Sequence, residues 1–374
     1  MFNISKIYVK IFYKKLIINI FRFIYPFPKL SKYSQDNSVK EFKIKFNGNK
    51  YSLFKLKNGS VFTDTNDTTA YISKNNNLTN ASMQYYKFDG INSYNGKLSK
   101  NPTIQRGTPK IRKKIKGRVL SLLSGGASRD NFTHWFTDVI PRIKIYEEKF
   151  KLHEIDKFYV PSFKYQYQKE SLKILGINLN KIISSEKYKH ITADYVFATS
   201  HPCYHFPTKV KKWSLNYLNQ KFSSVSYNKK KYRKIFIDRD QLQLIDKKNL
   251  KKYKNYRILI NELEIKNYLR SKGFEIIKPE NFSFKEQLKI FSNAKYIIGL
   301  YGAAMMMLTF CKKKTNVIEI KPILGGNEFK NISKLKNLNH KQINLKPLYK
   351  STTPQNGLLF CSINKIDKTI NSFS

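Results

Sequence analysis

The chain has 374 residues, of which 41% are hydrophobic and 14% aromatic, so it is long enough and apolar enough for two folded domains and is not a disordered chain. Its formal net charge of +46 comes from 61 Lys and only 10 Arg. Arginine is the preferred residue for bidentate contacts with phosphates and guanine, so this composition argues against a nucleic-acid reader. Lys, Asn, Ile, Tyr and Phe share A/T-rich codons, and we interpret the charge mainly as nucleotide-composition bias.

The three cysteines, Cys203, Cys311 and Cys361, lie far apart and form no CxxC pair. An odd number without a framework indicates a reducing compartment and argues against a structural zinc site. We therefore expect a cytoplasmic protein.

Residues 1–30 are apolar and aromatic and are predicted to form a basic N-terminal helix. Five basic residues interrupt the segment, and its longest uncharged run, Leu16–Phe21, is too short to span a membrane. Two interpretations remain open: a helix that rests on an anionic membrane surface, and a helix docked on the body of the protein.

Residues 31–222 are predicted to form the first domain, which begins with an irregular β-rich segment over residues 40–110. Val119–Leu123 is a buried-strand candidate that leads into a small-residue turn, Ser124–Ser128. Further on, strands are expected at Lys157–Val160 and Tyr195–Ala198, with a helix at Tyr167–Leu175 between them. The expected strands of the β-rich segment are Phe42–Phe46, Tyr51–Phe54, Val61–Phe62 and Ala70–Ile72.

The segment after the small-residue turn sets three polar side chains four residues apart: His134, Asp138 and Arg142. On a helix this spacing places them on one face, while Pro141 predicts a kink or an end near Ile140. Alone, the row favours a solvated ion pair over a functional site, because ion-pair networks also gather titratable groups.

A loop at residues 201–205 contains His201, Cys203 and His205. Its spacing matches no standard zinc pattern, so we predict no metal there and a loop near an acceptor site instead. The polar, Lys-rich run 223–234 is the predicted linker.

Residues 235–350 alternate strands with capped helices, which predicts βαβ units and a parallel sheet. One helix is expected from a capping box at Asn261 and Glu264 to Gly273, and another over 284–294 from a box at Ser283. A Met-rich helix follows residue 304, and residues 351–374 are a predicted tail. The expected strands are Ile235–Ile237, Phe274–Ile277, Tyr296–Ile298 and Val317–Ile320.

Several motifs over residues 117–345 together resemble the family 61 glycosyltransferases. Their order and spacing make the match specific. They are Asn131-x-x-His134-Trp135-x-x-Asp138-x-x-Pro141-Arg142, Ile237-Asp-Arg239, Arg257-x-Leu-x-Asn261-Glu262, Ser283-Phe-x-Glu-Gln287, Gly299-x-Tyr301-Gly302-Ala303-Ala304 and Val317-Ile-Glu319-Ile320.

The resemblance implies a GT-B-like α/β fold, in which two Rossmann-like domains face each other across a cleft. It also implies an inverting, metal-independent transfer, with the acceptor mostly on the N-terminal half and the nucleotide-sugar donor mostly on the C-terminal half. The donor is a substrate, and no other cofactor is expected. Inversion needs a general base, and the departing diphosphate needs positive charge and backbone N–H donors.

Carried onto this sequence, the resemblance makes Asp138 the first choice for the base, with His134 either the base itself or the group that orients it. The donor would be bound by Arg239 at the diphosphate, with the backbone at Gly302 and Ala303, and by Glu319 at the ribose hydroxyls. Asn261, Glu262 and Tyr301 complete the predicted donor-binding set, and Asn131, Trp135 and Arg142 the predicted substrate-binding set.

Structural alternatives to these roles remain open. Arg239 could pair with Asp238 or Asp240, Glu262 could be held by its helix dipole, Glu319 could end an edge strand, and Arg142 could buttress Asp138. The methionines at 305–307 fit core packing.

One position departs from the family pattern. The family usually carries His-Gly-Ala-Gly where this chain has Tyr301-Gly302-Ala303-Ala304. A phenol cannot become a cation, so any contribution of that His to the leaving-group charge would be lost.

The sequence thus predicts a glycosyltransferase of bacterial cell-surface or capsular polysaccharide synthesis, cytoplasmic and peripheral to the inner membrane. Its partners would be a nucleotide sugar, a glycan or lipid-linked glycan acceptor, and an anionic membrane. The rivals are a non-catalytic sugar-nucleotide or glycan-binding protein of the same fold and, more remotely, a nucleic-acid-binding protein.

Overall fold

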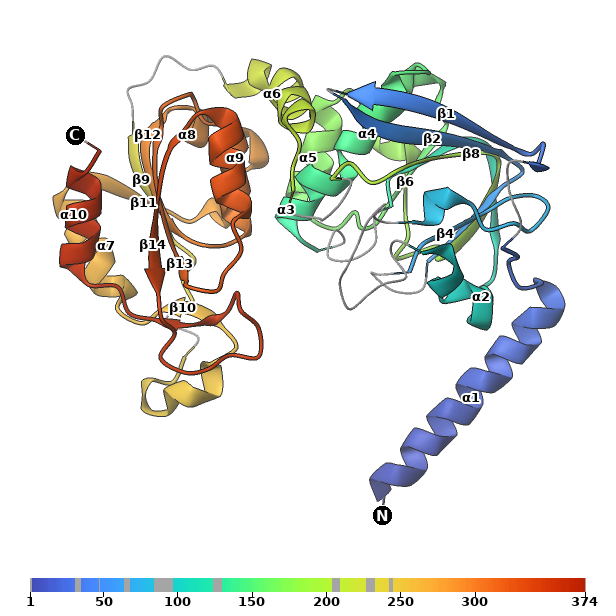
Figure 1. The fold of residues 1–374 in the computed structure, drawn as a ribbon, viewed down its shortest axis with the longest axis horizontal. Helices are drawn as coiled ribbons and strands as arrows, with labels where there is room; N and C mark the ends of the chain where they lie inside the picture. The colour runs from blue at the N-terminus through green and yellow to red at the C-terminus, as the bar shows by residue number, and fades with distance from the viewer. Residues whose placement is uncertain are drawn as a thin grey trace. The chain divides into compact units, whose positions relative to one another are not determined.

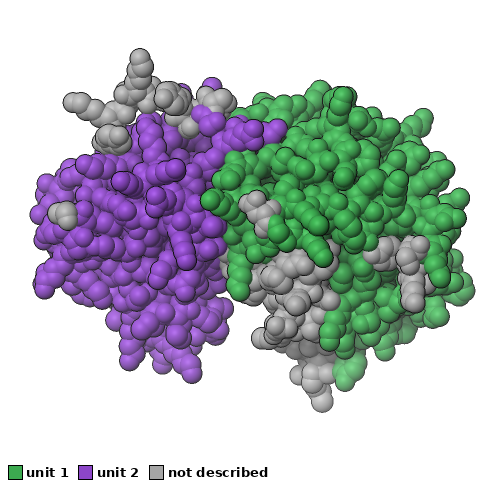
Figure 2. All heavy atoms as spheres, turned by 45° about the horizontal axis from the view of Figure 1, so that its top comes forward, with its two compact units in different colours: residues 1–217 green, residues 218–374 purple. Residues whose placement is uncertain are grey.

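The computed structural model describes residues 2–30, 35–46, 48–63, 68–83, 97–123, 130–203, 209–226, 233–241 and 245–373. The chain divides into two compact units, residues 1–217 and 218–374 (Figure 2). The predicted turn Ser124–Ser128 and His205 lie outside the described residues.

Unit 1 contains a mixed eight-stranded sheet with helices packed on it (Figure 1). Strands β8, β5, β6 and β7 run parallel in that order, and β2, β1 and the β3–β4 pair add to the β8 side as antiparallel strands. The strands are β1 Val39–Phe46, β2 Asn49–Lys57, β3 Ser60–Phe62, β4 Ala70–Ile72, β5 Lys113–Ser121, β6 Lys157–Val160, β7 Ile182–Ser184 and β8 His190–Thr199. The helices are α1 Phe2–Ile24, α2 Thr103–Arg106, α3 Phe132–His134, α4 Pro141–Glu147, α5 Gln166–Ile174 and α6 Lys212–Ser226, the last of which crosses into unit 2.

The predicted strands of the β-rich segment are all confirmed, but unit 1 differs from a Rossmann-like domain. A Rossmann-like sheet is mostly parallel with helical crossovers, whereas half of this sheet is antiparallel, because β2 and β3 both pair with β8 and carry β1 and β4 on their outer sides. Its core forms where alternate residues of β2, β5 and β8 pack together, including Phe54, Val119 and Val196.

Unit 2 contains a five-stranded, fully parallel sheet with the order β11-β9-β12-β13-β14, as the alternation of strands and helices predicted. Helices α7 and α10 cover one face, and α8 and α9 cover the other (Figure 1). The elements are β9 Arg233–Ile237, β10 Arg257–Leu259, α7 Glu262–Ser271, β11 Phe274–Ile277, α8 Phe284–Ser292, β12 Ala294–Leu300, a 3-10 helix Ala303–Phe310, β13 Asn316–Pro322, α9 Glu328–Lys336, β14 Asn339–Leu345, β15 Gly357–Leu359 and α10 Ile363–Asn371.

Several boundary predictions are corrected by the structure. The predicted linker 223–234 begins inside α6, which continues to Ser226, and ends inside β9. The predicted tail 351–374 belongs to unit 2, because β15 pairs with β10 and Ile366 of α10 is buried in the core under the sheet. Helix α8 ends at Ser292, two residues early, because Ala294 already pairs in β12.

The caps of two helices can be compared directly with prediction. Ser283 and Glu286 form the predicted capping box of α8. At α7 the Asn261 side chain donates to Glu264 Oε2 (3.1 Å), as the predicted pair implies, but it caps no backbone N–H. Its amide oxygen accepts instead from the backbone N–H of Cys361 (3.2 Å), and its nitrogen also donates to the Cys361 carbonyl (2.9 Å). Gly273 follows α7 with φ +77°, where a glycine is favoured, as predicted.

Candidate active site

The helical segment after residue 130 contains a π-helical turn. Asn131 caps the segment, since its side chain accepts from the backbone N–H groups of Thr133 and His134. The turn, Trp135–Val139, has a hydrogen bond from Ile140 N to Trp135 O (3.0 Å), and α4 begins at Pro141, which has no N–H to donate. The predicted boundary at Ile140 is thus present, and π turns of this kind are frequent at functional sites.

Asp138 is the centre of a buried hydrogen-bond network. Its side chain is fully buried, with His134 Nδ1 2.6 Å and His201 Nε2 3.6 Å from Oδ2. On the other oxygen, Oδ1, the Thr137 hydroxyl (2.7 Å) and the Cys203 thiol (3.6 Å) donate. Burial alone would raise the pKa of the Asp138 carboxyl, but the two imidazoles outweigh it and hold that pKa well below its usual range.

An ionised Asp138 fixes the tautomer of His134. A carboxylate only accepts, so Nδ1 of His134 carries the proton of their 2.6 Å hydrogen bond and Nε2 carries the lone pair. The His134 side chain is 18% exposed, whereas that of Asp138 is 0% exposed. The imidazole is therefore the more exposed member of the pair, and its neutral form would carry at Nε2 the lone pair that a general base needs.

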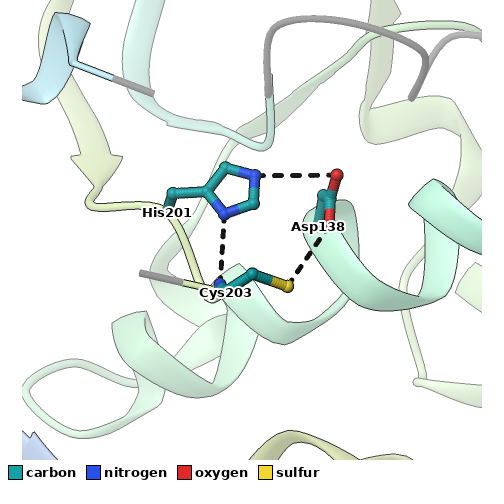
Figure 3. A group of neighbouring side chains, drawn as sticks. All are labelled: Asp138, His201 and Cys203. Atoms are coloured by element: carbon teal, nitrogen blue, oxygen red, sulfur yellow. Dashed lines mark hydrogen bonds and ion pairs between the residues drawn. The ribbon is translucent and has the colours of Figure 1, made fainter. Parts of the chain in front are cut away.

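Asp138, His201 and Cys203 also form a candidate metal-ligand group, because their ligand atoms lie within 4.8 Å of one another (Figure 3). However, the backbone N–H of Cys203 donates to Nδ1 of His201 (3.1 Å). A neutral His201 then carries its proton on Nε2, the nitrogen that faces Asp138, and has no lone pair there for a metal. Burial lowers the pKa of His201 and raises that of the Cys203 thiol, and the three side chains as arranged here form a hydrogen-bond network.

The predicted substrate contacts of this segment are corrected. Trp135 is fully buried and donates from Nε1 to Ser171 Oγ (2.9 Å), so it is a core residue. Arg142 is also buried, and it donates to the carbonyls of Asp138 (2.9 Å) and Thr199 (2.8 Å), which ties α4 to the carboxyl end of β8. Neither side chain has surface left for a substrate.

A pocket lies in unit 2 at the carboxyl ends of β9 and β12. Chain order reverses at this point, because β9 lies between β11 and β12, and open α/β sheets bind ligands at such switch points. The pocket has a volume of about 210 Å³, and its lining residues are Ile237, Asp238, Arg239, Pro279, Glu280, Leu300, Gly302, Ala303 and Ala304.

Two guanidinium groups meet at one edge of this pocket. Arg239 (3.1 Å) and Arg257 (2.8 Å) both donate to the backbone carbonyl of Tyr301. Burial, with the nearby Arg257 charge, lowers the pKa of Arg239 to about 10. Among the described residues, no carboxylate lies within 4.0 Å of either guanidinium. Glu262 and Glu280, the latter in the pocket lining, act on the charge of Arg239 from further away. Two arginines side by side are nevertheless a candidate anion site.

Gly302 leaves the room that the Arg239 guanidinium occupies in this arrangement. A Cβ at residue 302 would lie 2.9 Å from Arg239 Nη1, so any larger residue displaces the guanidinium. The predicted role of Gly302 and Ala303 at the pocket is consistent with their place in its wall.

The side chain of Tyr301 lies outside the pocket lining. Its hydroxyl donates to Glu328 Oε2 (2.9 Å), and the Arg257 guanidinium stacks 4.5 Å from the ring centroid. Burial and Glu328 raise the pKa of Tyr301, so the phenol is neutral. The predicted donor contact from this side chain is corrected: the Tyr301 main-chain carbonyl orients the arginines.

The remaining predicted donor residues have other partners. Glu262 is buried beside Lys266, which also pairs with Asp238 (2.7 Å). Glu319 is fully buried, with His340 Nε2 at 3.1 Å and Gln342 Nε2 at 2.8 Å from its Oε2, so the predicted ribose contact is not supported. Asn261 links α7 to Cys361 as described above.

The sequence Asp238-Arg239-Asp240 has the Asp-x-Asp spacing that can hold a metal–diphosphate complex, which sequence reasoning overlooked. In the structure each carboxylate has a cation beside it: Lys266 Nζ lies 2.7 Å from Asp238, and Lys278 Nζ 2.5 Å from Asp240. Arg257 was given no role from the sequence, although it belongs to one of the quoted motifs. It stands on β10, which pairs with β15 outside the five-stranded sheet, so the sequence pattern does not place it beside the pocket.

The fold is thus α/β, with a pocket at the switch point of its parallel sheet and, in its other unit, a buried carboxylate–imidazole pair. The chain belongs to the family described as glycosyltransferase 61, whose sequence profile matches residues 132–318, half of the chain, and it is a glycosyltransferase. No curated protein matches. Among solved structures it is similar to the bacterial iron-containing dodecameric glycosyltransferase TibC from enterotoxigenic E. coli H10407, with 10% sequence identity over 93% of this chain and 98% of that chain and a TM-score of 0.34.

Proposed function

We propose that the protein is an inverting glycosyltransferase that moves a hexosyl or pentosyl group from a nucleotide sugar to a hydroxyl of a glycan or lipid-linked glycan, with no metal or other cofactor. The proposed setting is synthesis of cell-surface or capsular polysaccharide in the bacterial cytoplasm, at the inner membrane. The observation that carries the catalytic part is the His134–Asp138 pair, with one fully buried, ionised member and one partly exposed, basic member.

The proposed step is a single in-line displacement. Nε2 of His134 takes the proton of the acceptor hydroxyl as its oxygen bonds to the anomeric carbon, and the bond from that carbon to the diphosphate oxygen breaks with its electron pair. Asp138 stays ionised and stabilises the imidazolium that forms. The sequence made Asp138 the first choice for the general base, whereas we propose His134. The full burial of Asp138 keeps its carboxylate from contact with an acceptor.

The leaving diphosphate would be neutralised by side chains of unit 2. Arg239 lines the pocket and Arg257 shares its anchor on the Tyr301 carbonyl, so together they present two positive charges to one anion. Metal independence is supported by the lysines beside Asp238 and Asp240, which occupy the place of a divalent cation.

The test is a thermal-shift screen of nucleoside diphosphates and nucleotide sugars, with Mg²⁺ or with EDTA, followed by transfer assays on each hit. We expect at least one nucleotide to stabilise the protein equally with Mg²⁺ and with EDTA, and Arg239→Gln to abolish that shift. Arg270→Gln, on the exposed side of α7, is the matched control. No stabilisation by any nucleotide would contradict the donor assignment, and stabilisation that needs Mg²⁺ would contradict metal independence.

The second candidate function is a weakened or inactive member of the family that binds a sugar nucleotide or a glycan. Tyr301 favours it, because the family usually has His at this position and the phenol here bonds to Glu328. Nucleotide binding with neither transfer nor donor hydrolysis would favour this candidate.

A further inference from the structure

Helix α1 presents a stripe of apolar side chains to solvent. Val9, Phe12, Leu16, Ile20 and Phe23 recur every three or four residues, so they share one face of the helix. They are 45–93% exposed, which is unusual for large apolar side chains gathered on one helix. Such a stripe in water indicates a surface that another phase or partner covers.

The charge of this segment is of one sign. Residues 1–35 contain no Asp or Glu, and α1 carries five basic residues. At 3.6 residues per turn, Lys15 and Arg22 fall together beside the apolar stripe. An apolar stripe with cations beside it and no acidic residue in the segment is typical of a helix that lies in the plane of an anionic membrane surface.

The chain directly after α1 is fixed to the body of unit 1. The Tyr25 hydroxyl accepts from the backbone N–H of Arg112 (3.1 Å), and the Arg112 guanidinium stacks 4.3 Å from the Tyr25 ring centroid. The Phe27 carbonyl accepts from Asn76 Nδ2 (2.8 Å). The residues that follow α1 are therefore attached to unit 1, while the apolar stripe of α1 itself stays exposed.

We propose that α1 docks this protein on an anionic lipid bilayer, with the apolar stripe at the boundary of headgroups and acyl chains and the lysines among the headgroups. No described helix is long and apolar enough to cross a membrane, so α1 lies on the surface. A second copy of the chain is the weaker occupant, because pairing two such helices would bring two acid-free, basic segments together without a counter-charge. The proposal goes beyond glycosyl transfer and does not depend on it.

The test is flotation of the full chain with vesicles of phosphatidylcholine alone or with about a third phosphatidylglycerol. We expect binding only to the anionic vesicles. Phe12→Ser with Leu16→Ser should weaken it about tenfold or more, because the apolar stripe is lost. Lys15→Glu with Arg22→Glu should weaken it by a similar factor and make the remaining binding less dependent on salt.

The matched control is Lys251→Glu with Lys252→Glu, which makes the same change in net charge at exposed positions of unit 2. This control should bind as the unaltered chain does. Equal loss in the control would overturn the proposal in favour of non-specific attraction of a basic protein. Equal binding to neutral vesicles would overturn it as well, and so would light scattering that shows a dimer which the Phe12/Leu16 change dissociates.

Discussion

Glu262→Gln should remove a pH dependence from the stability of unit 2. Glu262 is only 4% exposed in the first turn of α7, and Lys266 Nζ lies 3.8 Å from its carboxylate. Burial raises the pKa of Glu262 from 4.5 to about 7, with Asp238 adding to the rise and Lys266 opposing it.

The magnitude follows from linkage. The pKa is higher in the folded state, so the folded chain holds its proton where the unfolded chain has lost it, and the free energy of unfolding falls as pH rises from about 4.5 to about 7. The difference, 7 − 4.5 = 2.5 pKa units, corresponds to about 3.4 kcal/mol in full, of which about 2.5 kcal/mol is lost between pH 5 and pH 8. The Gln variant should lack this loss.

The assay is urea unfolding of both proteins at pH 5 and pH 8, followed by far-ultraviolet circular dichroism and by tryptophan fluorescence. Both tryptophans, Trp135 and Trp213, lie in unit 1, so fluorescence reports that unit and the circular dichroism reports both. The matched control is Glu264→Gln, an exposed carboxyl in the same helical turn. A difference between the native chain and Glu262→Gln that is the same at both pH values would refute the reasoning.

Three further predictions concern the proposed chemistry. His134→Gln should lower the single-turnover transfer rate by about 10² to 10⁴, the usual contribution of a general base, and should also lower the free energy of unfolding in urea, because the buried Asp138 carboxylate loses its 2.6 Å partner. Asp138→Asn should abolish transfer and also destabilise unit 1 by about 3–5 kcal/mol in urea, because it removes the charged centre of a buried network, while nucleotide binding measured by calorimetry stays intact. Gly302→Ala should weaken nucleotide binding in the same assay about tenfold, because its Cβ displaces the Arg239 guanidinium.

These three variants control for one another. Normal transfer by His134→Gln would exclude His134 as the base. Lost nucleotide binding in Asp138→Asn would mean that Asp138 does more than orient and stabilise the His134 imidazole. Unchanged nucleotide affinity in Gly302→Ala would exclude the Arg239 anion site.

Much of unit 2 could be predicted from the sequence, because its strands and helices are local patterns closed by local signals. The Ser283 cap, the Gly273 end and the apolar strand at 317–320 all act within a few residues of themselves. The antiparallel half of the unit 1 sheet could not be predicted, because it depends on pairings such as Leu53 with Thr199 across distant parts of the chain.

The candidate site, too, could be predicted from the sequence only where the contacts are local. The contact of His134 with Asp138 follows from their i,i+4 spacing, but the burial of both Trp135 and Arg142 does not. Residues 135–143 are buried on every side of the helix, so periodicity could not separate a substrate face from a core face. His201 reaches Asp138 from 63 positions further along the chain, and Arg257 reaches Tyr301 from another sheet.

The acceptor that aligns Arg239 and Arg257 is a main-chain carbonyl, which every amino acid supplies. The identity of residue 301 and the alignment of the two guanidiniums are therefore separable. A chain with Tyr in place of the family's His keeps the hydrogen bonds from Arg239 and Arg257 to the main-chain carbonyl of residue 301. The exchange changes only the side chain, whose hydroxyl here donates to Glu328. An exchange at this position therefore alters the charge behind the pocket while its cationic edge stays in place, so binding of a diphosphate there would persist whether or not transfer does.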